Sequence, residues 1–95
     1  MADKYTKSAQ GQCCQIRIPG VCNHDNATVV FCHINGGGMG MKHLSIHGAY
    51  GCTACHDVVD GRKDVGLHTD LLRLYHLDGV IRTQQLMVDQ RLLKL

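Results

Sequence analysis

The feature that most constrains the fold of this chain is its set of six cysteines, two of which, Cys52 and Cys55, form a C-x-x-C turn. A chain of 95 residues is close to the size at which a hydrophobic core alone gives only marginal stability. The sequence has no Trp, one Phe and three Tyr, so few large side chains are available to fill a core. Because the six cysteines and seven histidines are suitable ligands, we expect the chain to fold around a structural zinc ion.

The C-x-x-C turn presents two thiolates to one ion, so Cys52 and Cys55 supply half of a tetrahedral zinc site. The other half must come from the remaining cysteines. We choose Cys14 and Cys22, which bracket a Pro-Gly turn, although the adjacent Cys13 is a rival to Cys14. The alternative interpretation of the C-x-x-C turn is a redox pair or two small buried side chains.

The N-terminal segment and the cysteines bear on the compartment and the partners. The segment MADKYTKSAQGQ lacks the apolar region of a signal peptide, and no stretch approaches transmembrane length. We therefore expect a cytoplasmic protein without a membrane partner, in which reduced thiols bind metal rather than form disulfides. The formal net charge of +2 permits a DNA partner without arguing strongly for one.

The pattern of polar and apolar residues predicts one α+β domain. Residues 1–12 are polar and lack periodicity, which predicts a mobile arm followed by a single zinc-binding domain over residues 13–95. Residues 16–18 alternate as a short strand before the Pro19-Gly20 turn, and residues 28–34 (TVVFCHI) predict a second strand in which Cys32 is a packed thiol. Four glycines in residues 36–40 predict a loop, and the residues after Cys52 predict a helix that stops at Asp60-Gly61.

Apolar residues in the C-terminal segment predict one long helix, or two helices broken near Gly79. These residues lie near a single helical stripe, made of Leu67, Leu71, Leu74, Ile81, Val88 and Leu92. The stripe exceeds what so small a core needs. A homodimer through this segment is therefore a further hypothesis.

Two histidines stand where a shared zinc would bring them together. His33 ends a predicted strand, and His56 follows Cys55 at the start of a predicted helix. Asp60, four residues beyond His56, shares its helical face and can offer a carboxylate to a cation or an imidazole N–H. These residue types are suited to phosphodiester hydrolysis, with His33 as the base and His56 as a metal ligand. We expect surface or structural roles for the other histidines outside this pair, His24, His43, His68 and His76.

The ordered set CQIRIPGVCN, TVVFCHI, GMGMK and CTACHDVVDGR, from Cys14 to Arg62, resembles the HNH (His-Me finger) endonucleases built on a treble-clef zinc scaffold. More closely, it resembles the small predicted nucleases encoded by phages and prophages. The resemblance implies a ββα-metal core with a C-terminal helix or helices. It also implies a structural zinc held by four cysteines, separate from a catalytic divalent ion. His33 would be the general base of this site, and His56 would bind the catalytic ion.

The resemblance extends to further site residues. His47 best fills the middle position of the HNH pattern, with His43 and Ser45 as competitors. Many HNH enzymes place a metal-binding Asp or His before the catalytic histidine, where this chain has Cys32, which leaves the catalytic ion open among Mg²⁺, Mn²⁺, Ni²⁺ and Zn²⁺. Two basic residues are expected to contact substrate phosphates, Lys42 and Arg62.

The leading functional hypothesis is therefore a metal-dependent endonuclease that hydrolyses phosphodiester bonds in DNA. The alternative is a catalytically inactive, zinc-stabilised DNA- or protein-binding module. Thiol redox chemistry at Cys52 and Cys55 is a third hypothesis, and it differs from the others because bound zinc would protect these thiols from alkylation.

Overall fold

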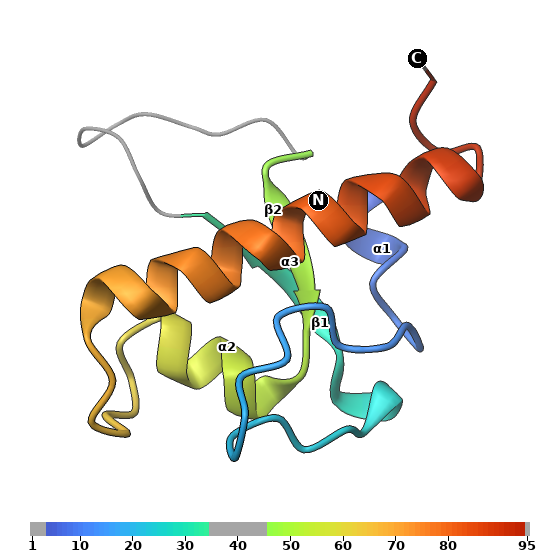
Figure 1. The fold of residues 1–95 in the computed structure, drawn as a ribbon. Coiled ribbons are helices and arrows are strands. Elements are labelled where there is room, and N and C mark those ends of the chain that lie inside the picture. The colour runs from blue at the N-terminus through green and yellow to red at the C-terminus, as the bar shows by residue number, and fades with distance from the viewer. Residues whose placement is uncertain (1–3, 35–45, 95) are drawn as a thin grey trace.

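The computed structural model describes residues 4–34 and 46–94. Its elements, in chain order, are α1 (Lys4–Lys7), a short 3-10 helix (Asn26–Thr28), β1 (Val30–His33), β2 (Gly48–Gly51), α2 (Thr53–Val59) and α3 (Thr69–Asp89). β1 and β2 form a two-stranded antiparallel sheet in which Val30 lies opposite Gly51 and His33 opposite Gly48. α3 packs across this hairpin, and α2 lies below the first half of α3 in Figure 1. The described residues thus form a small α+β fold, as the sequence predicts.

The core lies between the hairpin, the segment from residue 14 to residue 22, and the helices α2 and α3. Its largest fully buried side chains are Tyr50, Ile16, Ile18, Met87 and Val58. A Cβ atom on Gly51 would lie 2.6 Å from the Cδ1 atom of Ile16. The absence of a side chain on Gly51 therefore lets the cysteine-bearing segment lie directly against β2.

The described part of the N-terminal segment, residues 4–12, turns through α1 and packs against the hairpin. Ala9 is only 1% exposed, and the hydroxyls of Ser8 and Tyr50 form a hydrogen bond of 2.6 Å. The fully buried Tyr50 favours this contact, because a buried phenol needs a polar partner and Ser8 supplies one.

The predicted strand over residues 16–18 is wrong, although the burial alternates as expected. Ile16 and Ile18 are buried and Arg17 is exposed, but Arg17 has a φ of +57°, which no strand residue adopts. The turn that follows is confirmed, since Gly20 has a φ of +75° and the N–H groups of Val21 and Cys22 donate to the Ile18 carbonyl. The strand predicted over residues 28–34 is present but shorter, from Val30 to His33. β2 has no local sequence signal, because its two glycines disfavour a strand.

α3 is one unbroken helix, and three residues of the predicted apolar stripe, Leu71, Leu74 and Ile81, are exposed. Its buried residues are instead His76, Gly79, Val80, Thr83 and Met87. The helix continues through Gly79 because that glycine is a contact point, where a Cβ atom would lie 3.1 Å from both Ala49 Cβ and Ile16 Cγ1. Among residues 4–34 and 46–94, no helix is both long and apolar enough to cross a membrane.

We expect Gly79→Val to lower the free energy of unfolding by about 1–3 kcal/mol, the usual cost of overpacking a tight site. The Cβ atom alone would already be crowded by Ala49 and Ile16, so the two methyl groups would push α3 off the hairpin. Urea unfolding followed by circular dichroism measures the change. Gln85→Val, at an exposed position of the same helix, is the matched control and should change the stability by about 0.5 kcal/mol or less. Equal stability of Gly79→Val and the wild type would contradict this packing.

Candidate functional site

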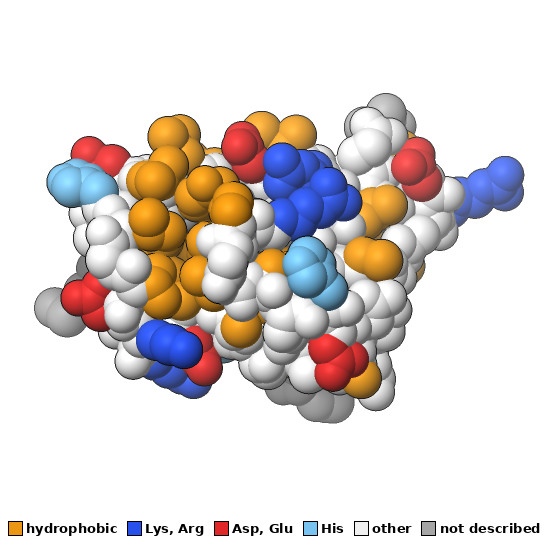
Figure 2. Space-filling model, turned by 60° about the horizontal axis from the view of Figure 1, so that its bottom comes forward, with side chains coloured by type: hydrophobic (Ala, Val, Ile, Leu, Met, Phe, Trp, Pro, Cys, Tyr) orange, Lys and Arg blue, Asp and Glu red, His pale blue; other side chains and the backbone are white. Residues whose placement is uncertain are grey.

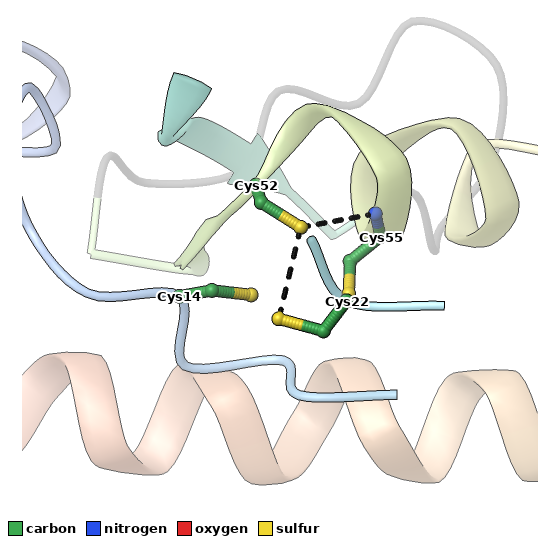
Figure 3. A group of neighbouring side chains, drawn as sticks. All are labelled: Cys14, Cys22, Cys52 and Cys55. Atoms are coloured by element: carbon green, nitrogen blue, oxygen red, sulfur yellow. Dashed lines mark hydrogen bonds between the residues drawn. The ribbon is translucent and has the colours of Figure 1, made fainter. Parts of the chain in front are cut away.

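Four cysteines from two separate parts of the chain converge beside the hairpin (Figure 3). Cys14 and Cys22 flank the turn at residues 18–22, Cys52 caps the N-terminus of α2, and Cys55 lies in its first turn. The four sulfur atoms all lie within 4.8 Å of one another, and those of Cys22 and Cys52 are 3.9 Å apart. Zinc–sulfur bonds of about 2.3 Å in a tetrahedron place the sulfurs about 3.8 Å apart. The cluster is therefore close to the size that a zinc ion requires.

Local backbone geometry prepares these sulfurs as ligands. The Cys52 sulfur accepts the N–H of Cys55 at 3.4 Å, which closes the first turn of α2 around the site. The Cys14 sulfur accepts hydrogen bonds from the backbone N–H groups of Arg17, Cys52 and Ile16. The left-handed backbone at Arg17 turns this segment around that sulfur. Hydrogen bonds of this kind stabilise thiolates and orient them towards an ion.

The thiols of the cluster share their protons. The Cys55 thiol donates to the Cys14 sulfur, which lowers the pKa of Cys14 to about 4 and raises the pKa of Cys55. Desolvation raises the pKa of Cys22 to about 11. Four thiolates at these separations repel one another, so full ionisation needs a cation that supplies the opposite charge. The donor set therefore fits a divalent ion that prefers sulfur, such as zinc.

The two remaining cysteines lie outside the cluster. Cys13 is exposed, and its sulfur accepts a hydrogen bond from the Asn26 side chain at 3.4 Å. Cys32 is 1% exposed, and burial raises its pKa to about 12, so its thiol stays protonated as a small packed side chain. The cluster thus contains Cys14 rather than its rival Cys13, and it leaves Cys32 in the core.

We expect Cys14→Ser to lose most of its bound zinc and Cys13→Ser to retain it, because only the first variant removes a member of the cluster. Metal content per chain is measured on protein purified without chelators. The variant without zinc should also unfold several degrees below the wild type, since metal binding adds directly to folding stability. Zinc loss in Cys13→Ser together with retention in Cys14→Ser would reverse the assignment.

His33 and His47 lie where β1 ends and where the chain enters β2. His33 is the last residue of β1, it is exposed, and its ring stands edge-on to Phe31 with centroids 4.9 Å apart. Beyond the pair of His33 and Gly48, the N–H of Ile34 donates to the carbonyl of His47 at 3.0 Å. The antiparallel ladder therefore places the backbones of both histidines at one edge of the sheet.

His56 lies on α2 beside a carboxylate. Its Nε2 atom is 4.0 Å from Oδ2 of Asp60, one helical turn later, and both side chains are about a quarter exposed. Arg62 lies past the helix end, with its Nε atom 3.3 Å from the same carboxylate oxygen. An imidazole and a carboxylate at this separation could offer two ligands to one cation, with Arg62 at the edge. Lys42, like the His47 competitors His43 and Ser45, lies outside the described residues.

A buried histidine that we expected to be structural stands close to this pair. His76 of α3 is 8% exposed and donates from Nε2 to the carbonyl of Cys32 at 2.8 Å. Burial lowers its pKa, and the charges of Arg73, His56 and Asp60 act on it. A cavity of about 240 Å³ opens beside it between α2 and α3, lined by Val58, Val59, Leu72, Arg73 and others. The sequence could have indicated that His76 is a core residue, because it lies at helical spacing from Gly79, Val80, Thr83 and Met87.

These observations define the class of the protein: a small α+β protein with a four-cysteine cluster that could hold a metal ion such as zinc. The family model described as "Putative nuclease YbcO" matches residues 3–91. The chain belongs to this family.

Two curated relatives are similar over their whole length. "Putative nuclease YbcO" of Escherichia coli (strain K12) and "Putative nuclease ybcO" of Enterobacteria phage 82 are each 37% identical to this chain over 100 aligned residues, which cover 99% of both proteins. A solved structure is also similar, the "Structure of a putative bacteriophage protein from Escherichia coli str. K-12 substr. MG1655". It has a TM-score of 0.79 and 33% identity, over 92% of this chain and 99% of that chain.

Proposed function

We propose that this protein is a metal-dependent DNA endonuclease of the HNH type, built on a treble-clef zinc scaffold. The observation that carries the proposal is the position of the cysteine cluster. Its members stand before the hairpin and at the start of α2, so a bound zinc would tie a β-β-α unit together at its base. His33 at the end of β1 and His56 on α2 then belong to the same rigid unit. The relatives described as nucleases agree with a nucleic-acid substrate.

In the proposed mechanism His33 acts as the general base. Its neutral imidazole, exposed at the end of β1, takes a proton from the attacking water. His56 and Asp60 would hold the catalytic divalent ion, because their ligand atoms lie 4.0 Å apart on one helical face. Such an ion, when bound, neutralises charge on the scissile phosphate and stabilises the leaving oxygen. His47 is the third proposed catalytic residue, since its backbone is held next to that of His33.

The substrate-binding residues of the proposal are basic. Arg62 is bound to Asp60, and we propose that it turns to a DNA phosphate when a cation neutralises that carboxylate. Lys42 remains a prediction from the sequence. Because zinc held by thiolates needs reduced cysteines, the proposed location is the cytoplasm.

One observation favours the alternative of a binding module without catalysis. Cys32 occupies the position of a metal-binding Asp or His in many HNH enzymes, and its buried thiol with a pKa raised to about 12 is a poor ligand for a hard cation. The two proposals differ in whether the purified protein cuts DNA.

We expect the wild-type protein to nick plasmid DNA with at least one of Mg²⁺, Mn²⁺, Ni²⁺ or Zn²⁺, and His33→Ala to reduce the rate about 10²–10⁴-fold, the usual contribution of a general base. Asp60→Asn should instead raise the ion concentration needed for half-maximal rate, since it weakens one ligand of the ion. Gel electrophoresis of supercoiled plasmid measures both. His68→Asn is a matched control at another exposed histidine, where Asn can still cap α3, and it should keep the wild-type rate. Cleavage that survives His33→Ala would remove the mechanism, and DNA binding without cleavage would favour the module.

We also propose a homodimer formed through the outer face of α3. Figure 2 shows hydrophobic side chains gathered over α2 and the first half of α3. Leu74 and Ile81 are 57% and 66% exposed, and apolar residues recur along this face at the alternating three- and four-residue spacing of a helix–helix contact. Within the described residues only α3 is long enough to match such a face, so its occupant is a second α3.

We expect the wild type to show the mass of a dimer in light scattering and Leu74→Glu to show that of a monomer, because a buried, unpaired carboxylate would oppose association. Gln10→Glu, at an exposed residue outside α3, is the control and should remain dimeric. A monomeric wild type at high micromolar concentration would reject the dimer and leave the nuclease proposal intact.

A further inference from the structure

α3 binds the rest of the domain through polar side chains as well as through its apolar face. His76 donates to the Cys32 carbonyl at 2.8 Å, and Gln84 donates from Nε2 to the Ile46 carbonyl at 2.6 Å. Arg82 donates to the Gln15 carbonyl at 2.7 Å, and Thr83 accepts the Tyr50 N–H at 2.9 Å. Two of these contacts reach backbone carbonyls that stand one residue before a proposed catalytic histidine.

The location of those two carbonyls matters because a peptide unit is planar. The carbonyl oxygen of Cys32 lies in the same plane as the backbone nitrogen and Cα of His33, so holding the oxygen limits rotation of the plane that carries His33. The Ile46 carbonyl is related in the same way to His47. Each hydrogen bond from α3 therefore restricts the direction in which one imidazole leaves the backbone.

The donors themselves are well fixed. Their helix is seated by the Gly79 contact with Ala49 and by the fully buried Met87. His76 and Gln84 lie eight residues apart, which is about 12 Å along a helix. They thus reach β1 and the residues just before β2, beside the backbone hydrogen bond between Ile34 and His47.

We infer that His76 and Gln84 are positioning residues, which hold the peptide planes of His33 and His47 at the orientation that catalysis requires. The inference rests on the proposed function for the roles of those two histidines. His76 carries a proton on Nε2, because the Cys32 carbonyl can only accept, and burial lowers its pKa, which favours the neutral ring. Neither residue contacts the substrate. A misplacement of about 1 Å at a reacting group can cost about 10²-fold in rate, so the loss of one such bond should be measurable.

The test compares His76→Leu with His76→Gln and Gln84→Met with Gln85→Met, using plasmid cleavage with the most active ion. His76→Leu and Gln84→Met remove the donor, and we expect each to lower kcat at least tenfold while KM changes less than twofold. His76→Gln keeps an amide donor and should recover most of the lost rate. Gln85 is exposed and its amide bonds to Asp89, so Gln85→Met is the matched control and should keep the wild-type kcat.

A second measurement does not depend on activity. In Gln84→Met the amide hydrogen of Ile34, which donates to His47, should exchange at least tenfold faster, while the Asp60 amide in α2 keeps its protection. Unchanged kcat in His76→Leu and Gln84→Met would overturn the inference, as would an equal loss in Gln85→Met. If the wild type fails to cut DNA with every ion tested, the proposed function fails. Hydrogen exchange then decides alone, and unchanged protection of Ile34 in Gln84→Met overturns the positioning role.

Discussion

The convergence of four cysteine sulfurs is the contact on which the arrangement of this small domain depends. It joins the turn at residues 18–22 to the start of α2, two segments that are about thirty residues apart in sequence. The apolar core is small, with Tyr50 as its largest fully buried side chain, so this junction determines where α2 lies relative to the hairpin. His56 and Asp60 follow the cluster along the chain at α2, and His33 ends β1. The position of the cluster therefore determines how these candidate site residues lie relative to one another.

α3 is the second organising element, and it serves two surfaces. Its inner face combines packing at Gly79 and Met87 with polar contacts to backbone groups of both strands. Its outer face carries exposed leucine and isoleucine side chains. A helix with apolar residues on opposite sides is unusual for a monomer in water, because only one side can reach the core of a small domain. The proposed pairing of two such helices would give both faces a partner.

Some of these features could be predicted from residues near one another in sequence. The C-x-x-C turn, the Pro19-Gly20 turn and the end of α2 at Asp60-Gly61 follow from local rules of turn and cap chemistry, and each lies where expected. The choice of Cys14 over Cys13, made because Cys14 and Cys22 bracket the Pro-Gly turn, also agreed with the cluster.

Other features depend on contacts between distant residues, which periodicity cannot show. The packing of residues 4–12 against the hairpin includes the hydrogen bond between Ser8 and Tyr50. The glycines of β2 leave room for the side chains of Ile16 and Phe31. The core face of α3 contains a histidine, a threonine and a glycine, which a hydrophobic pattern ranks below the exposed leucines. The polar residues face inward because the strands offer backbone groups that they can bind.

The proton shared between Cys14 and Cys55 would link metal uptake to acidity. The Cys55 thiol lowers the pKa of Cys14, whereas the pKa values of Cys22 and Cys55 are raised, so an arriving ion would have to displace protons from these two sulfurs. Hydrogen ions and a metal ion would therefore compete for the same sulfurs, and acidification would shift that competition against the metal. Since these groups also join the turn at residues 18–22 to the start of α2, the chain would lose that junction and its ion together.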